Sequence, residues 1–142
     1  MRIAVCVIAM AILVLPAAAD SVAVAIGNFG LIGSWATDCT TELTAARPGF
    51  RAIFSDPPGG APVYTTISVD EGVKTAVRST IQAAVLLSPR KLKLTLKIIG
   101  GDRDGFPLPS PTTNTFEQTF EILDNRLQIG AATPISLQLC RN

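Results

Sequence analysis

The chain contains no histidine, and this absence removes several kinds of chemistry together. Its 142 residues include three cysteines, two methionines and one tryptophan, but no histidine. Ser-His-Asp and Cys-His mechanisms need an imidazole base, and the usual zinc sites need imidazole ligands or several thiolates. We therefore expect no enzyme of these classes, no metal site and no cofactor. A hydrolase that uses carboxylates is the enzymatic hypothesis that remains.

Long apolar runs are also scarce, and the longest one lies at the N-terminus. Arg2 precedes an apolar stretch over residues 3–15, which is followed by Pro16 and three alanines at 17–19. A basic start, a short apolar run and an A-x-A site are the layout of a secretory signal peptide. A bilayer-spanning helix needs about 20 apolar residues, so this stretch is too short to span a membrane.

The signal divides the chain into two parts. We predict a secretory signal peptide over residues 1–19, cut before Asp20, with a second and less favoured cleavage site at Ala-Val-Ala, residues 23–25. Residues 20–142 then form a single β-barrel domain, which is periplasmic or secreted. We expect no transmembrane segment in this mature chain.

The mature chain has no excess of charge of either sign. The whole sequence has a formal net charge of +1, and removing Arg2 with the signal takes this to zero. Proteins that bind nucleic acids or anionic membranes carry a basic excess. We therefore expect no nucleic-acid partner, and we expect a small apolar molecule or an envelope protein instead.

The cysteines predict one covalent link. Cys6 lies within the signal, so maturation leaves Cys39 near the start and Cys140 near the end of the domain. In an oxidising compartment two such cysteines pair by default. We predict a Cys39–Cys140 disulfide, which closes a loop of about 100 residues and stabilises the fold by about 4–5 kcal/mol in the chain-entropy model.

Much of the remaining sequence alternates between apolar and polar residues, with turn residues between the segments. The clearest case is residues 91–99, where Leu92, Leu94 and Leu96 alternate with lysine and threonine. Such alternation is typical of strands with one buried face, and many short strands without a convincing helix are typical of an all-β sandwich or barrel. The expected strands are residues 33–37, 50–55, 63–69, 91–99, 115–123, 126–130 and 136–140.

Two segments are less regular. Residues 20–31 read as a short apolar lead-in to the first strand. Residues 73–87 fit either a helical stripe or a strand alternation, and their β-branched residues favour one long bent strand or two short ones. With this segment the expected total is eight or nine strands.

The strands at 91–99 and 115–123 are expected to pair antiparallel. One register places two lysines opposite two glutamates, as the pairs Lys97–Glu117 and Lys93–Glu121, which contribute about 0.2–1 kcal/mol each. The two glutamates themselves lie about 13 Å apart along one strand face. This separation is too large for the carboxylate pair of a glycosidase, so we expect a solvated outer face.

The tripeptide Gly-Ser-Trp at residues 33–35 stands at the entry of the first expected strand. It resembles the G-x-W motif that opens lipocalins and avidin-like barrels, in which the tryptophan plugs one end of an up-and-down barrel. The longer stretch G-S-W-A-T-D-C at residues 33–39 is similar to the start of a family of small secreted bacterial β-barrel proteins. The resemblance implies an all-β fold, a small antiparallel up-and-down β-barrel of about eight strands.

The resemblance also implies roles for particular residues. Trp35, with Gly33, would form the plug at one end of the barrel. In lipocalins an arginine from the end of the chain packs across this tryptophan. In this chain either Arg126 or Arg141 fits that description, and the sequence does not choose between them.

The candidate ligand site lies in a loop rich in proline and glycine at residues 100–114. Long loops in compact domains are uncommon and often functional. This loop mixes apolar and charged side chains, as a ligand gate does. Its alternating aspartates hint at a calcium loop, but a third oxygen ligand and the distal glutamate are missing, so a charged turn is favoured. The candidate ligand-binding residues are Asp102, Arg103, Asp104, Phe106 and Leu108.

Three functions remain as hypotheses. The first is a binding module that takes a small apolar ligand at the barrel mouth beside residues 100–114, opposite the end plugged by Trp35. The second is a structural or protein-interaction protein of the envelope, with a barrel filled by its own side chains and no ligand. The third and least favoured is the carboxylate hydrolase.

Overall fold

The computed structural model describes residues 19–40, 42–109, 114–130 and 132–141. Residues 1–18 lie outside this part, and so does the predicted signal peptide except for Ala19. The proposed cleavage before Asp20 therefore falls at the start of the described chain.

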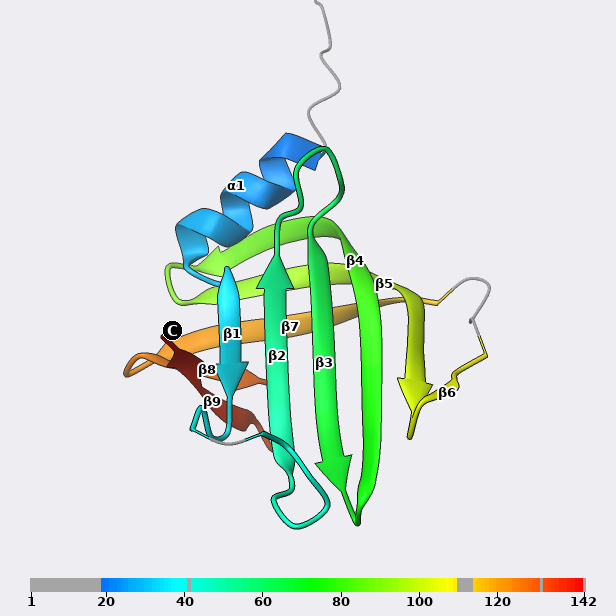
Figure 1. Ribbon diagram of the computed structural model, residues 1–142. Coiled ribbons are helices and arrows are strands. Elements are labelled where there is room, and N and C mark those ends of the chain that lie inside the picture. The colour runs from blue at the N-terminus through cyan, green and yellow to red at the C-terminus, as the bar shows by residue number, and fades with distance from the viewer. Residues whose placement is uncertain (1–18, 41, 110–113, 131, 142) are drawn as a thin grey trace, which may run out of the picture.

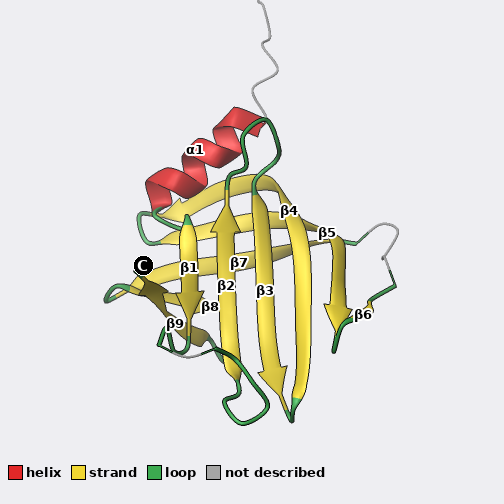
Figure 2. Cartoon of the chain, in the orientation of Figure 1, coloured by secondary structure: helices red, strands yellow, loops and turns green. Residues whose placement is uncertain are grey.

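Eight antiparallel strands close into an up-and-down barrel, which confirms the predicted fold class (Figures 1 and 2). Each barrel strand pairs with the next one along the chain, and the last strand, β9, pairs with the first, β1. A short extra strand, β6 (Phe106–Pro107), pairs with the end of β5. The barrel strands are β1 (Gly33–Ala36), β2 (Gly49–Ser55), β3 (Val63–Asp70), β4 (Val73–Ser88), β5 (Lys91–Arg103), β7 (Thr115–Leu123), β8 (Arg126–Ile129) and β9 (Ile135–Cys140).

The ambiguous segment after Asp70 forms one long strand, β4. It pairs with β3 along its first half and with β5 along most of its length. Its register against β5 shifts at three places, one of them between Ile81 and Ala83. Such irregularities bend a strand and increase its twist, which allows β4 to follow the curvature of the barrel. Of the alternatives left open by the sequence, a single strand is the one observed.

Side chains fill the middle of the barrel. Every leucine of β5 between Lys91 and Lys97 is at most 1% exposed, on the face that the alternation predicted. The rings of Phe54 and Tyr64 stack with centroids 4.7 Å apart, and Phe120 meets both rings edge-on at 5.4 and 5.5 Å. An eight-stranded barrel is just wide enough for side chains to fill it, and here apolar side chains occupy that space.

A helix that the sequence analysis missed covers one end of the barrel. α1 (Ala19–Phe29) occupies the segment predicted as an apolar lead-in, so that prediction is wrong. Val22 and Ile26 lie one turn apart and are 6% and 0% exposed. Their spacing gives the helix one apolar face, and the open end of the barrel provides the surface that buries it. Figure 1 shows α1 lying across this end of the barrel.

The helix ends in a Schellman motif that turns the chain into β1. Gly30 has a φ of 84°, a left-handed conformation that suits glycine. The N–H of Leu31 donates to the carbonyl of Ile26 at 3.0 Å, and the N–H of Gly30 donates to the carbonyl of Gly27 at 3.0 Å. Leu31 and Ile26 are both fully buried, which is the apolar contact that accompanies this motif.

β5 and β7 pair antiparallel as predicted, but their register differs from the predicted one. Lys91 faces Glu121, where Lys93 was expected, so the predicted pairs Lys97–Glu117 and Lys93–Glu121 are wrong. The shift is two residues, which leaves every side chain on its predicted face because side chains alternate with period two. The ion pairs that form are Lys91–Glu121 at 3.6 Å and Lys93–Glu117 at 3.0 Å.

The predicted loop at residues 100–114 begins as regular structure instead. β5 continues to Arg103, and the chain reverses at Asp104 and Gly105 so that β6 pairs back onto β5. Asp104 and Gly105 have φ values of 51° and 80°, as a two-residue type I′ hairpin turn requires. Residues 110–113 of the predicted loop lie outside the described residues.

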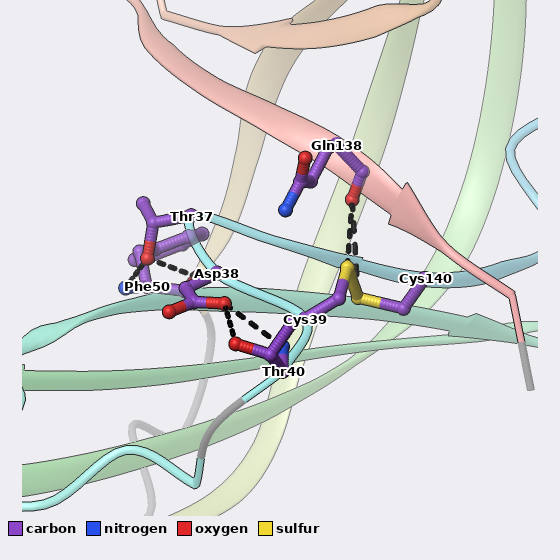
Figure 3. The surroundings of a disulfide bond; sticks show 7 residues. All are labelled: Thr37, Asp38, Cys39, Thr40, Phe50, Gln138 and Cys140. Atoms are coloured by element: carbon purple, nitrogen blue, oxygen red, sulfur yellow. Dashed lines mark hydrogen bonds between the residues drawn. A yellow bond between two sulfur atoms is a disulfide. The ribbon is translucent and has the colours of Figure 1, made fainter.

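The predicted disulfide between Cys39 and Cys140 is present (Figure 3). The two Cα atoms lie 5.3 Å apart although the residues are separated by 101 positions in the chain. The bond joins the segment after β1 to the end of β9, next to the pairing of Ser34 with Cys140 that closes the barrel. The Gln138 carbonyl oxygen lies 3.7 Å from Sγ of Cys39. This is a van der Waals contact, because a disulfide sulfur carries no proton to donate.

Candidate functional site

Because side chains fill the barrel, a binding site has to lie at one of its ends or on its outer wall. We call the end covered by α1 the helix-capped end. We call the end where the β3–β4 turn meets the β5–β6 hairpin the hairpin end (Figure 1). The two ends offer a ligand different surroundings.

The hairpin end holds the residues that the sequence predicted as ligand-binding. One carboxylate oxygen of Asp104 accepts a hydrogen bond from the backbone N–H of Lys74 at 2.8 Å, and the N–H of Asp104 donates to the Lys74 carbonyl at 2.8 Å. The carboxylate of Asp102 accepts a hydrogen bond from the N–H of Gly105 at 3.3 Å. These contacts shape the turn and tie it to β4, so each carboxylate has a structural role.

The other predicted residues at this end also leave little space for a ligand. Phe106 is 75% exposed, and Arg103 is exposed beside it. The N–H of Leu108 donates to the carbonyl of Gly101 at 3.0 Å, and the Leu108 side chain packs where Gly101 lacks a Cβ. The three rim hollows and the outer-wall hollow described below are lined by other residues. The five predicted residues thus lie near one another, but none of them lines one of these four hollows.

Three adjoining hollows lie along the rim of the helix-capped end, and we call them the rim hollows. Their volumes are about 290, 330 and 400 Å³ for the first, second and third. The first and second share Phe29 and Pro89, and the second and third share Ile122 and Asn125. They therefore follow one another around the C-terminal end of α1.

The lining of each rim hollow comes from elements that are far apart in the sequence. The first is lined by Ala25, Asn28, Phe29, Leu86, Pro89 and Leu92. The second is lined by Phe29, Pro89, Arg90, Ile122, Asp124 and Asn125. The third is lined by Gly30, Trp35, Ile122, Asn125, Gln138, Leu139 and Arg141.

Trp35 connects the third rim hollow to the core. It is 3% exposed, and its indole N–H donates to the carbonyl of Leu31 at 2.9 Å. Leu31 is fixed in turn by its own N–H bond to Ile26 in the motif that ends α1. The helix end therefore positions the indole, which satisfies its single donor and leaves an apolar ring beside the hollow.

The third rim hollow combines apolar and neutral polar groups. Leu139 faces Trp35 across the β1–β9 pairing and is 37% exposed, and Ile122 is partly buried nearby. The side-chain amides of Asn125 and Gln138 contribute hydrogen-bonding groups to the lining. Mainly apolar lining with a few polar groups is typical of small-molecule sites.

Of the two arginines that the resemblance suggested beside Trp35, one lines the same hollow. Arg141 lines the third rim hollow together with Trp35. Arg126 instead donates to the hydroxyl oxygen of Ser136 at 2.8 Å and to its carbonyl at 3.3 Å. The placement thus associates Arg141, rather than Arg126, with the tryptophan.

The outer wall carries the largest described hollow, with a volume of about 450 Å³. It lies between Leu87, Leu123 and the loop that contains Gly130. Glu121 lines it but is paired with a lysine, as is Glu117, so both carboxylates have cationic partners on the outer face.

Burial raises the pKa of Tyr64 well above its usual value, which keeps this core phenol neutral.

Neither a metal-binding cluster nor a membrane-spanning helix occurs among the described residues. They contain no group of three or more histidine, cysteine, aspartate or glutamate side chains that could hold a metal ion. Among them, α1 is not long and apolar enough to cross a membrane.

Comparison with protein-family models, curated protein sequences and solved structures found no match to this chain. The resemblance of residues 33–39 to small secreted barrel proteins therefore stays a prediction.

The residues that line the rim hollows were not identified from the sequence as a site. Phe29 belongs to the missed helix, and Ile122 and Leu139 read as ordinary strand residues. Pro89 and Asn125 carried a turn signal, but turns are common at both ends of a barrel. Trp35 was singled out from the sequence, and so was Arg141, as one of two alternatives for the arginine beside it.

Proposed function

We propose that this protein is an exported binding module that takes a small apolar ligand in the rim hollows at the helix-capped end. The observation that carries the proposal is the third rim hollow, in which the single tryptophan of the chain meets Ile122 and Leu139. The ligand class is the one inferred from the sequence. The proposed site, in contrast, lies at the helix-capped end and not at the hairpin end, where the sequence placed it.

Size and continuity support this placement. Small-molecule sites usually have volumes of about 300–1,000 Å³ and mainly apolar walls. The first and third rim hollows have about 290 and 400 Å³ and mainly apolar walls, and the second, of about 330 Å³, joins them but adds the charged Arg90 and Asp124. A ligand larger than one hollow can therefore extend from Trp35 towards Phe29.

Export to the periplasm or the medium is supported by the signal layout together with the disulfide, which persists in oxidising compartments. α1 also supports cleavage before Asp20. A cut after Ala25 would remove Val22, which is 6% exposed in the core, whereas a cut before Asp20 leaves both Val22 and Ile26 in place.

The test is a titration of the mature protein with the neutral apolar probe N-phenyl-1-naphthylamine, read by energy transfer from Trp35. Leu139→Asn should weaken binding about fivefold, because it removes roughly 1 kcal/mol of apolar contact. The matched control is Ile135→Asn, on the same strand and equally exposed at 38% against 37%, which lines none of the rim hollows. Absence of saturable binding by the unmodified protein would contradict the proposal.

A second candidate function, protein interaction in the envelope, is favoured by one specific observation. Val85 and Leu87 at the end of β4 lie on the outer face and are 50% and 51% exposed, although both are aliphatic. Contiguous exposed apolar residues often mark interaction surfaces. A photo-reactive side chain at Leu87 should give one defined protein adduct in the envelope, while the same group at Phe106, which is 75% exposed, gives none. Equal adducts from both positions would argue against this candidate.

A further inference from the structure

We infer that the ligand of the third rim hollow is an amphipathic anion, with its acidic group at Arg141 and its apolar part against Trp35 and Leu139. This inference rests on the proposed function and names the class of its ligand. It begins from the charges of the hollow. Arg141 is the one charged residue in the lining, and every other lining residue is apolar, glycine or a neutral amide.

The guanidinium of Arg141 is available for a ligand. Arg141 is exposed, and within the described chain neither an ion pair nor a side-chain hydrogen bond engages it. The described ion pairs use Lys91 and Lys93, and Arg126 is occupied by Ser136. Arg141 therefore differs from these three cations in having donors without a partner among the described residues.

The second rim hollow differs from the third in the charges that line it. It is lined by Arg90 but also by Asp124, so its two charges offset each other. An anionic group is thus favoured in the third hollow over the second. Ile122 and Asn125 line both hollows, so the third hollow adjoins the second on this side.

The chemistry of arginine narrows the class of the acidic group. A planar guanidinium binds a carboxylate, sulfonate or phosphate through paired hydrogen bonds, and it repels a cationic ligand. The indole and the leucine side chain favour rings or an acyl chain beside that group. The expected ligand therefore carries a single acidic group on a compact apolar body.

Two probes that share one ring system test the inference. The first is 8-anilino-1-naphthalenesulfonate, and the second is N-phenyl-1-naphthylamine, which lacks the sulfonate. Both are titrated against the mature protein, with energy transfer from Trp35 reporting binding and the variants assigning it to the third hollow. The variants are Arg141→Gln and, as a control on the outer face of β4, Arg78→Gln.

We expect the sulfonate probe to bind more tightly than the neutral one. Arg141→Gln should weaken sulfonate binding about tenfold, at the lower end for hydrogen bonds to a charged group because the site is exposed, and should leave the neutral probe unchanged. Arg78→Gln should change neither. Added salt should weaken only the sulfonate probe.

The failures of the two proposals are distinguishable. If the two probes bind equally well and Arg141→Gln affects neither, the anionic class is wrong while the binding site stands. If neither probe binds saturably, the proposed function itself is wrong. A sulfonate effect that Arg78→Gln reproduces would also overturn the role of Arg141.

Discussion

The two ends of the barrel differ in what their side chains contact. At the helix-capped end, Phe29, Ile122 and Leu139 present apolar surface to the rim hollows. At the hairpin end, Asp102 and Asp104 direct their carboxylates to backbone N–H groups, and neither residue lines a rim hollow. A stretch rich in aspartate, glycine and proline thus marks where the chain turns. A hollow arises where side chains from separate elements meet without filling the space between them.

The two ends also differ in how firmly they are joined to the core. α1 buries Val22 and Ile26 against the inner side chains of the barrel. The β5–β6 hairpin is held mainly by backbone hydrogen bonds and by the contact between Asp104 and Lys74. Apolar contacts should therefore dominate the stability of the helix-capped end, and substitutions of exposed residues at the hairpin end should cost little.

Removing the disulfide should have the largest effect on stability among the variants considered. The double variant Cys39→Ser, Cys140→Ser should lower the free energy of unfolding by about 4 kcal/mol, because the bond closes a long loop. Cys140 lies between Leu139 and Arg141, so probe binding at the third rim hollow should weaken as well. Urea unfolding of the oxidised protein and the variant measures the first effect. An unchanged unfolding midpoint would contradict this account of the crosslink.

The next largest effect compares one apolar residue from each end. Ile26→Ala should cost about 2–4 kcal/mol, because Ile26 is fully buried and its truncation leaves a cavity under α1. Phe106→Ala should change stability by at most about 0.5 kcal/mol, because the ring is 75% exposed. Urea unfolding followed by Trp35 fluorescence gives both values. Equal costs would mean that α1 is not anchored as described.

The smallest difference is expected between two glycines that are needed for different reasons. At Gly101 a Cβ would overlap the carbonyl oxygen of Ala76, so Gly101→Ala should cost about 1–3 kcal/mol through a forced backbone shift. At Gly30 a Cβ meets nothing, and the cost of about 1 kcal/mol comes from the φ of 84° alone. Thermal or urea unfolding should therefore rank Gly101→Ala as the more damaging. The reverse order would argue against this close approach of β4 and β5.

The fold could be predicted because its signals are local. Alternation in residues 91–99 and 115–123 identified strands and their inner faces, and the predicted signal peptide left one cysteine pair in the domain. Alternation determines on which face of the sheet each side chain lies. It determines the pairing register only to within an even number of residues, so a register two residues away fits equally well. The predicted pairing of Lys97 with Glu117 failed for this reason.

The helix and the site could not be predicted in the same way. Residues 19–29 form a helix whose apolar face is covered by an open barrel end, and that end exists only after the strands have closed. The rim hollows need Phe29, Pro89, Asn125 and Leu139 together, and no sequence spacing relates these positions. Asp104-Gly105 had a correct turn signal, but such a signal does not distinguish a ligand gate from a tight hairpin.

The most direct test of the central claim is to map bound N-phenyl-1-naphthylamine by amide chemical-shift changes in the isotope-labelled mature protein. The account predicts saturable changes at Phe29, Ile122, Leu139 and the indole N–H of Trp35. Amides of Asp102, Asp104 and Phe106 should remain unchanged. Saturable changes confined to the hairpin end, with the helix-capped end unaffected, would contradict the claim and return the site to the place first inferred from the sequence.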